Sequence, residues 1–289
     1  MSMGMTDRFA VFILTHGRPD KVITYRTLRN QGYTGDIYII VDNEDKTIDR
    51  YRENYGDAVI VFDKLAISKT FDTGDNFEDR RAVVYARNAC WKIAEELGLD
   101  YFLQLDDDYR VFNYKFTAQM VSTEKPVLNI DRLFCVVLDY YKKISAATIA
   151  LAQNGDFLGG VRGGDLSRVW LKRKAMNVFF CATSRPFQFV GRINEDVNTY
   201  TSYGNRGLLM GTIFSAAIIQ ESTQTSEGGM TGLYLNEGTY IKSFYTIMYC
   251  PSFVKVYMMG DTHKRMHHRI SWNNAVPKIL SENCRRAQP

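Results

Sequence analysis

The sequence predicts a mixed α/β fold, with a mostly parallel sheet, helices on both of its faces and an antiparallel extension in the C-terminal half. In the first third of the chain, four short apolar runs alternate with segments that have helical spacing. From residue 155 onward, Gly-rich turns and mixed segments such as NVFFCATS replace that alternation. The first pattern indicates βαβ units with right-handed crossovers, and the second indicates antiparallel strands.

The four expected strands are too short, and too rich in β-branched and aromatic residues, to be helices. They cover residues 8–14, 36–42, 57–62 and 100–105. Because strands joined by helical crossovers run parallel, their carboxyl ends should meet at one edge of the sheet.

The clearest helix is expected over residues 79–97, with Asp79 able to cap its start. One stripe of this segment carries small and apolar residues at helical spacing, namely Ala82, Ala86, Ala89, Ile93 and Leu97.

A second long helix is expected over residues 130–153, after Pro126, with Asn129 or Asp131 as its cap. No internal repeat, low-complexity segment or Pro/Ser-rich linker divides the chain. We therefore expect a single domain over residues 1–289 whose C-terminal half binds a second substrate.

Composition sets few limits on function. The 289 residues are 45% hydrophobic, which is enough for a sizeable core. The net charge of +4 is compatible with a polyanionic partner and equally with an ordinary solvated surface.

No apolar run reaches the roughly 18 residues that span a bilayer, and the first residues lack the apolar region of a signal peptide. We expect a cytoplasmic protein with no membrane partner, whose five cysteines are reduced core thiols.

Polar residues follow each expected strand, where ligands bind in open α/β sheets. The residues to inspect are therefore Thr15, His16, Gly17 and Arg18, then 42–45, then Asp63 and Lys64, and finally Asp106, Asp107 and Asp108.

The aspartate triplet indicates a divalent metal site. Three adjacent carboxylates at the end of a buried strand repel one another and lose hydration, so a cation stabilises them. Mg²⁺ and Mn²⁺ prefer oxygen ligands and commonly take one or two carboxylates plus diphosphate oxygens, which Asp106 and Asp108 could provide between them. An acidic, solvated loop with turn-capping aspartates is the alternative interpretation.

Three of the four histidines lie near the C-terminus in DTHKRMHHR. Imidazole could complete a coordination sphere begun by the aspartates, and His267 and His268 are better placed for this than His263. The alternative is a basic surface cluster.

A phosphate-binding glycine motif is absent after the first strand, where THGRPDK instead offers Arg18 and Lys21. In the C-terminal half, NEDV places Glu195 and Asp196 before a helical stretch, where a carboxylate could take a proton from a hydroxyl. The residues Asn-Glu-Asp of this segment are also a good helix start. Glu227, in the turn TSEGGMTG, could line the same site, although turn formation alone explains the glycines.

Basic residues also cluster with aromatic ones, a combination that suits a phosphate backbone and an exposed base and equally an ordinary charged face. The first cluster contains Arg168, Trp170, Lys172, Arg173 and Lys174, and the second contains Tyr257, Lys264, Arg265, Arg269 and Trp272.

Several of these features, taken in order along the chain, resemble the GT-A glycosyltransferases: the strand-terminal LDDDY, Arg87 and Asn88 before it, the later NED and the late histidines. The resemblance implies a GT-A-like fold with a Rossmann-type sheet. It also implies that the first aspartate of the DxD motif contacts the nucleotide and the last binds Mn²⁺ or Mg²⁺. A later carboxylate would act as base, and a C-terminal histidine would add a metal bond.

Segments over nearly the whole chain are similar, more narrowly, to the TET/JBP-associated glycosyltransferases of bacteriophages. They are FILTHGRPDKVITYRTL, YIIVDNED, YFLQLDDDYRVF, SEGGMTGLYLNEGTYIKSF and MHHRISW. That family is implicated in attaching sugars to 5-hydroxymethylpyrimidines, such as 5-hydroxymethylcytosine, in phage DNA, which would place the protein in the host cytoplasm.

Carried onto this sequence, the resemblance implies a role for each matching residue. Asp106 and Asp108 would take the DxD roles, Asp196 with Glu195 the catalytic role, and His267 or His268 the late metal position. The nucleotide-sugar would be flanked by Thr15, His16, Arg18, Asp42, Arg87 and Asp106. Residues 1–110 would form the donor-binding half, and 111–289 the acceptor-binding half with the metal-completing tail. The triplet leaves open which aspartates bind, and NED leaves open whether the anomeric carbon inverts.

The expected function is metal-dependent hexosyl or pentosyl transfer from a UDP-sugar to a 5-hydroxymethylpyrimidine in DNA. A protein, lipid or carbohydrate acceptor is the first alternative. A metal-dependent nuclease or nucleotidyltransferase would also use clustered aspartates and basic flanks. A nucleic-acid-binding module with structural aspartates is the alternative without catalysis.

Overall fold

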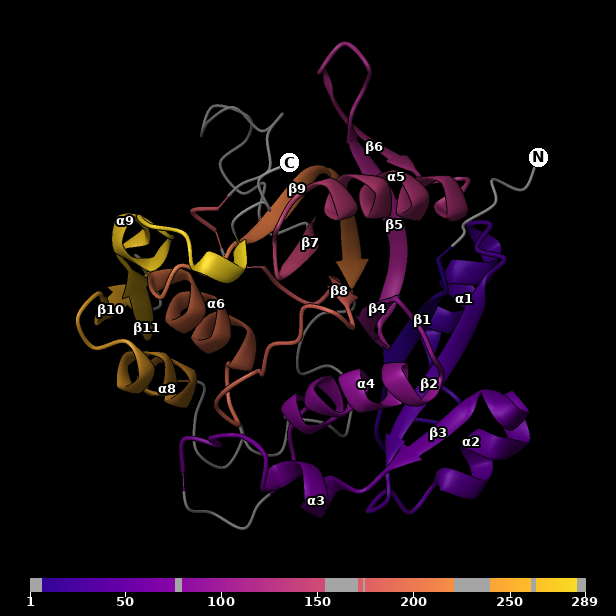
Figure 1. The fold of residues 1–289 in the computed structure, drawn as a ribbon. Coiled ribbons are helices and arrows are strands. Elements are labelled where there is room, and N and C mark those ends of the chain that lie inside the picture. The colour runs from indigo at the N-terminus through magenta and orange to yellow at the C-terminus, as the bar shows by residue number, and fades with distance from the viewer. Residues whose placement is uncertain are drawn as a thin grey trace.

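The computed structural model describes residues 7–75, 80–153, 171–173, 175–220, 240–260 and 264–284. Their strands form one nine-stranded sheet, in the order β3-β2-β1-β4-β8-β7-β9-β5-β6, and a separate two-stranded ribbon, β10-β11 (Figure 1). The predicted mixed α/β class is confirmed.

The parallel half of the large sheet consists of the four strands that the sequence predicts. They are β1 (Phe9–Leu14), β2 (Asp36–Asp42), β3 (Val59–Phe62) and β4 (Tyr101–Asp106). Every pairing among them is parallel. Because β1 lies inside the sheet and both of its faces are covered, all six of its residues are buried.

The other half of the sheet is mixed. Strand β8 is antiparallel to both of its neighbours, β7 and β9 pair in parallel, and β5 is antiparallel to β9 and β6. These strands are β5 (Tyr109–Phe116), β6 (Ser122–Pro126), β7 (Thr148–Gln153), β8 (Phe179–Ala182) and β9 (Met210–Gln220).

Helices cover both faces of the sheet, as the sequence predicts, and each face has its own apolar core. On one face, α1 (Ile23–Asn30), α2 (Ile48–Tyr55) and α5 (Ile130–Lys143) pack on Val11 and Ile13. On the other face, α4 (Val84–Glu96) and α6 (Glu195–Asn205) pack on Ala10 and Phe12. Alternate residues of β1 therefore belong to different cores, which fixes the register of this strand.

The helix expected over residues 130–153 is shorter than predicted, and its last part is a strand. Asn129 caps its start, as one of the two predicted caps, by accepting a hydrogen bond from the Arg132 amide at 2.8 Å. The helix ends at Lys143, however, and Ile144 is extended. Residues 148–153, TIALAQ, form β7, a fully enclosed strand whose continuous apolar run looks like a buried helix segment in the sequence. The helix predicted over 79–97 is present as α4 but begins only at Val84, with Val83 at the N-cap position, so the predicted start is wrong. Its proposed cap Asp79 lies outside the described residues.

The C-terminal elements form a group of their own beyond α6, on the side of the molecule away from β1–β3 (Figure 1). They are α8 (Ile241–Tyr249), β10 (Val254–Met259), β11 (Arg265–Ile270) and α9 (Trp272–Ala275). Short helical turns occur at Lys64–Ser68 (α3), Gly56–Ala58 and Glu282–Cys284. None of the described helices is long and apolar enough to cross a bilayer.

Candidate active site

The loops after β1, β2 and β4 meet at one edge of the sheet, because these strands are adjacent and parallel. The register pairs Leu14 of β1 with Asp106 of β4, so Thr15 lies beside Asp107. The structure thus brings together most of the site residues that the sequence predicts.

Asp107 joins the first and fourth loops. Its Oδ2 accepts a hydrogen bond of 2.7 Å from the Thr15 hydroxyl, and its Oδ1 lies 3.3 Å from the Arg18 guanidinium. The Tyr51 hydroxyl lies 2.9 Å from Thr15 Oγ1 and accepts from the Arg18 amide at 2.8 Å. Asp107 is therefore buried and holds the loop that follows β1 in place. The aspartate triplet in the sequence did not reveal this role.

His16 and Asp42 pair across the first and second loops. His16 Nδ1 lies 2.7 Å from Asp42 Oδ2, and Lys64 Nζ lies 3.2 Å from Asp42 Oδ1. The hydrogen bond to Asp42 raises the pKa of His16 above its usual 6.5. Burial raises the pKa of Asp42, but hydrogen bonds from His16 and Lys64 outweigh it, so the net shift is downward. His16 keeps 42% of its side chain exposed and can reach a ligand.

Asp106 belongs to a buried ion-pair bridge. Arg87, 1% exposed, donates through Nη2 to Asp106 Oδ1 at 2.9 Å and through Nε to Glu195 Oε1 at 3.0 Å. One guanidinium cannot fully compensate two carboxylates at low hydration, so burial raises the pKa of both Asp106 and Glu195. Arg87 thereby fixes the end of β4 to the start of α6, where Glu195 lies 108 residues after Arg87 in the chain.

Asp108 differs from its two neighbours. Its Oδ1 is buried and has no hydrogen-bond partner among the described residues. Burial, reinforced by the charges of Asp106 and Asp107, raises the pKa of Asp108 to about 7. An ionised oxygen in this position needs an external donor or cation. The all-oxygen donors Asp106 and Asp108 fit a hard divalent ion such as Mg²⁺ or Mn²⁺.

Asp196 lies beside this bridge at the first turn of α6 and faces Asp106, whose pKa its charge raises. The turn before it is held by Asn194, a non-glycine residue at φ +61°, whose side chain donates to Thr246 Oγ1 at 2.6 Å. A strained backbone that is fixed by a side chain is common at functional sites.

The family of TET-Associated Glycosyltransferases matches residues 9–229, more than half of the chain. The chain belongs to this family. It is a glycosyltransferase, and the matched residues contain the strand-end loops, the Arg87 bridge and α6.

Solved structures with similar folds have low sequence identity to this glycosyltransferase. Glucosyl-3-phosphoglycerate synthase from Mycobacterium tuberculosis, in complex with Mg²⁺ and UDP, is 7% identical with a TM-score of 0.45, over 92% of this chain and 88% of that one. Mannosyltransferase PcManGT from Pyrobaculum calidifontis, in complex with GDP-Man and Mn²⁺, is 12% identical with a TM-score of 0.49, over 85% and 63%. S. aureus TarS 1-349, in complex with UDP, is 12% identical with a TM-score of 0.44, over 84% and 65%. No curated protein sequence matches the chain.

The two predicted histidine ligands belong to the C-terminal ribbon. His267 and His268 lie on β11, with ring centroids 4.5 Å apart. In the part of the glycosyltransferase that the structure describes, no three His, Cys, Asp or Glu side chains are grouped closely enough to hold a metal ion. Coordination by either histidine stays a prediction. His263 and Glu227 lie outside the described residues, as do Arg168, Trp170 and Lys174.

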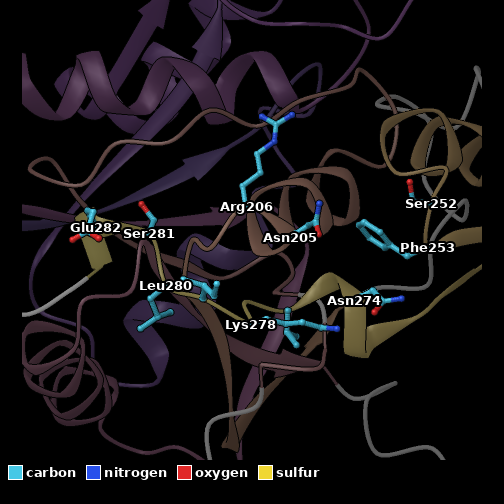
Figure 2. A pocket seen from close by; sticks show the side chains of 11 residues that line it. Asn205, Arg206, Ser252, Phe253, Asn274, Lys278, Leu280, Ser281 and Glu282 are labelled. Carbon is cyan, nitrogen blue, oxygen red and sulfur yellow. The ribbon is translucent and has the colours of Figure 1, made fainter.

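A pocket of about 680 Å³ lies at the end of α6 opposite Glu195 (Figure 2). Asn205 and Arg206 of the last turn of α6 line it, together with residues between Ser252 and Glu282. The 11 residues of α6 separate its two ends by about 16 Å. The pocket is therefore distinct from the strand-end site.

Tyr51, Lys64 and Asp45 are site residues that sequence reasoning missed or left without a role. Asp45 Oδ2 accepts from the Gly17 amide at 2.6 Å, and its Oδ1 accepts from the Thr47 amide at 2.7 Å. The Asp-x-Thr spacing is a local turn signal that could have found the second of these bonds. The contacts of Tyr51 and Lys64 cross between loops and have no local signal.

Proposed function

We propose that this glycosyltransferase uses Mn²⁺ or Mg²⁺ to transfer a sugar from a UDP-sugar to the hydroxyl of a 5-hydroxymethylpyrimidine in bacteriophage DNA. Membership of a TET-associated family supports an acceptor of this kind, because TET-type oxidation of a methylpyrimidine produces the hydroxymethyl group. The neighbouring folds with bound UDP, GDP-Man, Mg²⁺ or Mn²⁺ match this donor chemistry in kind.

Asp108 is the observation that carries the proposal. Its buried Oδ1 has no partner among the described residues, it stands at the carboxyl end of the sheet, and Asp106 is next to it. The cation would supply the positive charge that a departing diphosphate requires. Thr15, His16, Arg18 and Asp42 would then surround the nucleotide.

The acceptor hydroxyl would approach from the α6 side. Asp196 is the proposed base, because it is half-buried, lies in the first turn of α6 and faces the aspartates. Its neighbour Glu195 is held by Arg87 and would position the start of α6. In this arrangement residues 1–110 form the donor half and residues 111–289 the acceptor half.

Sugar transfer tests the proposal directly. The enzyme is incubated with a radiolabelled UDP-sugar, Mn²⁺ and DNA that contains either 5-hydroxymethylcytosine or cytosine. We expect label on the modified DNA alone. Label on neither DNA, but on a protein, lipid or carbohydrate acceptor, would replace DNA as the substrate. Cleavage of the DNA without a donor would indicate a nuclease.

Asp108→Asn tests the metal role. The amide is nearly isosteric and lacks the charge, so we expect Mn²⁺-dependent transfer to fall to background while the thermal midpoint is unchanged or higher. Asp107→Asn is the comparison variant, because Asp107 binds Thr15 and Arg18 and is not proposed as a ligand. It should lower the thermal midpoint and leave the Mn²⁺ dependence of the remaining transfer in place. Equal turnover by Asp108→Asn and wild type would remove the metal from this site.

A further inference from the structure

The positive charge of the chain is concentrated at its C-terminal end, away from the strand-end site. The last fifty residues contain eight of the 36 Lys and Arg but two of the 32 Asp and Glu. Among the described residues 240–260 and 264–284, Glu282 is the one acidic residue. The rest of the chain is slightly acidic in balance, so the small net charge conceals a strong asymmetry.

The β10–β11 ribbon presents part of this charge on one face. Its register places Lys255 opposite Arg269, and the Arg269 guanidinium lies 5.5 Å from the centroid of the Tyr257 ring. Side chains alternate along a strand, so Lys255, Tyr257 and Arg269 share a face. Lys255 and Arg269 are exposed, and neither forms an ion pair within the described residues. By contrast, the buried cations Arg87 and Lys64 pair with carboxylates.

The other face of the ribbon carries the exposed aliphatic side chains Val256, Met258 and Met266. Cations and aliphatic groups are thus separated on opposite faces. A membrane surface would use both together, whereas a polyanion needs the cationic face alone. A two-stranded ribbon also has a width that the major groove of duplex DNA admits.

A pocket adjoins the start of the ribbon, and helix α8 connects the ribbon to α6. The pocket of about 680 Å³ begins at Ser252 and Phe253, directly before β10, and adds Arg206 and Lys278 alongside Glu282 (Figure 2). Helix α8 packs against both ribbon strands and against α6. At the start of α6, Thr246 of α8 binds Asn194 and Asn198 at 2.6 and 2.8 Å. The ribbon is therefore fixed to the helix that carries Asp196.

We propose that the Lys255, Tyr257 and Arg269 face of the β10–β11 ribbon binds the phosphate backbone of duplex DNA and holds the acceptor beside α6. The choice of DNA rests on the proposed function. The cations supply sequence-independent affinity, and discrimination between modified and unmodified bases belongs to the active site.

The test measures binding separately from sugar transfer. Fluorescence anisotropy follows a labelled DNA duplex as full-length enzyme is added, without donor or metal and at several salt concentrations. For Lys255→Gln with Arg269→Gln, we expect weaker binding and a salt dependence whose logarithmic slope falls by about one for each lost phosphate contact. The matched control is Lys92→Gln with Arg132→Gln, which removes the same charge from exposed positions on α4 and α5 and should bind like wild type.

The outcomes separate this inference from the proposed function. If the ribbon variant binds duplex with the wild-type slope, or if wild type binds anionic lipid vesicles and not DNA, the inference is wrong whatever the enzyme transfers. If the ribbon variant loses binding while no enzyme glycosylates modified DNA, the inference holds and the proposed acceptor fails. If both proposals hold, the variant has a raised KM for DNA and an unchanged rate of UDP-sugar hydrolysis without acceptor.

Discussion

The strand-end site and the β10–β11 ribbon differ in whether their charged side chains are buried and paired. At the strand ends, charged groups are buried and paired, as in the Arg87 bridge and the His16–Asp42–Lys64 group. On the ribbon, Lys255 and Arg269 are exposed and no ion pair occupies them in the described residues. Paired, buried charges hold a site in one geometry before a ligand arrives, whereas unpaired, exposed charges attract a large polyanion from any direction. The difference suits a small donor at one region and a long acceptor at the other.

This comparison predicts that removal of a paired charge at the strand ends costs stability, and that removal of an unpaired charge on the ribbon does not. Arg87→Met should have the largest effect, because it leaves Asp106 and Glu195 as buried carboxylates without a partner. We expect a loss of about 3–5 kcal/mol in the free energy of unfolding, measured by urea denaturation at neutral pH. Arg87→Lys, which keeps the charge, should lose less.

The pH dependence of Arg87→Met provides its control. Burial already raises the pKa of Asp106 and Glu195, and loss of the guanidinium should raise both further. A carboxyl whose folded-state pKa lies above its unfolded value destabilises the fold above the unfolded pKa, and protonation at lower pH relieves this. The variant should therefore recover stability relative to wild type as pH falls toward 5. A difference that is constant with pH would show that Arg87 acts by packing on Phe179 and Phe189 instead.

Thr15→Val should have an intermediate effect. The substitution keeps the shape of the side chain and removes the hydroxyl that donates to the buried Asp107 carboxylate. The substitution also removes the hydrogen bond between Thr15 and the Tyr51 hydroxyl. Loss of the hydrogen bond to the buried charged group alone costs about 1–3 kcal/mol, which a thermal or urea midpoint detects. Thr15→Ser retains the donor and loses one buried methyl group, so it should cost roughly 1 kcal/mol or less. A loss of stability in the Ser variant but not in the Val variant would indicate that the methyl group, not the hydroxyl, holds the β1 loop.

The sequence predicted the donor side of the molecule better than the acceptor side, for physical reasons. Buried strands show as short apolar runs, and residues after them must meet at one edge, so the positions of His16, Asp42 and Asp106 follow from local pattern. The role of Asp107 depends on Thr15, 92 residues earlier, and the bridge of Arg87 depends on Glu195, so neither has a local signal. TIALAQ was assigned to a helix because a fully buried strand lacks the alternation that distinguishes a half-buried one.

The C-terminal basic cluster was visible in the sequence, but the sequence did not show which of its side chains lie on the same face of the ribbon. Tyr257, Arg269 and His267 stood together as basic and aromatic residues, and His267 and His268 also suggested metal ligands. Only the register of β10 with β11 shows that Lys255 joins Arg269 on one face. The histidines lie on the same ribbon, and the described residues hold no group of three possible metal ligands that includes them.

The smallest expected effect distinguishes the two regions because it depends on pH at the strand ends and not on the ribbon. His16 has a raised pKa through its hydrogen bond to Asp42, so the charged pair stabilises the fold fully below pH 6.5 and loses this contribution as pH rises through the folded-state pKa. Asp42, whose pKa is lowered, contributes above its usual 3.8 and loses its contribution as pH falls. The pair is therefore strongest between these limits. Because His16 is 42% exposed and Lys64 still compensates Asp42, we expect His16→Gln to cost about 0–1 kcal/mol there, and less above pH 7. Urea titrations of both proteins from pH 5 to 8 measure this difference. A ribbon variant, Lys255→Gln, should show no pH-dependent difference in stability from wild type over the same range. If the stability difference between His16→Gln and wild type instead grows with pH, the neutral imidazole, not the ion pair, stabilises the loop.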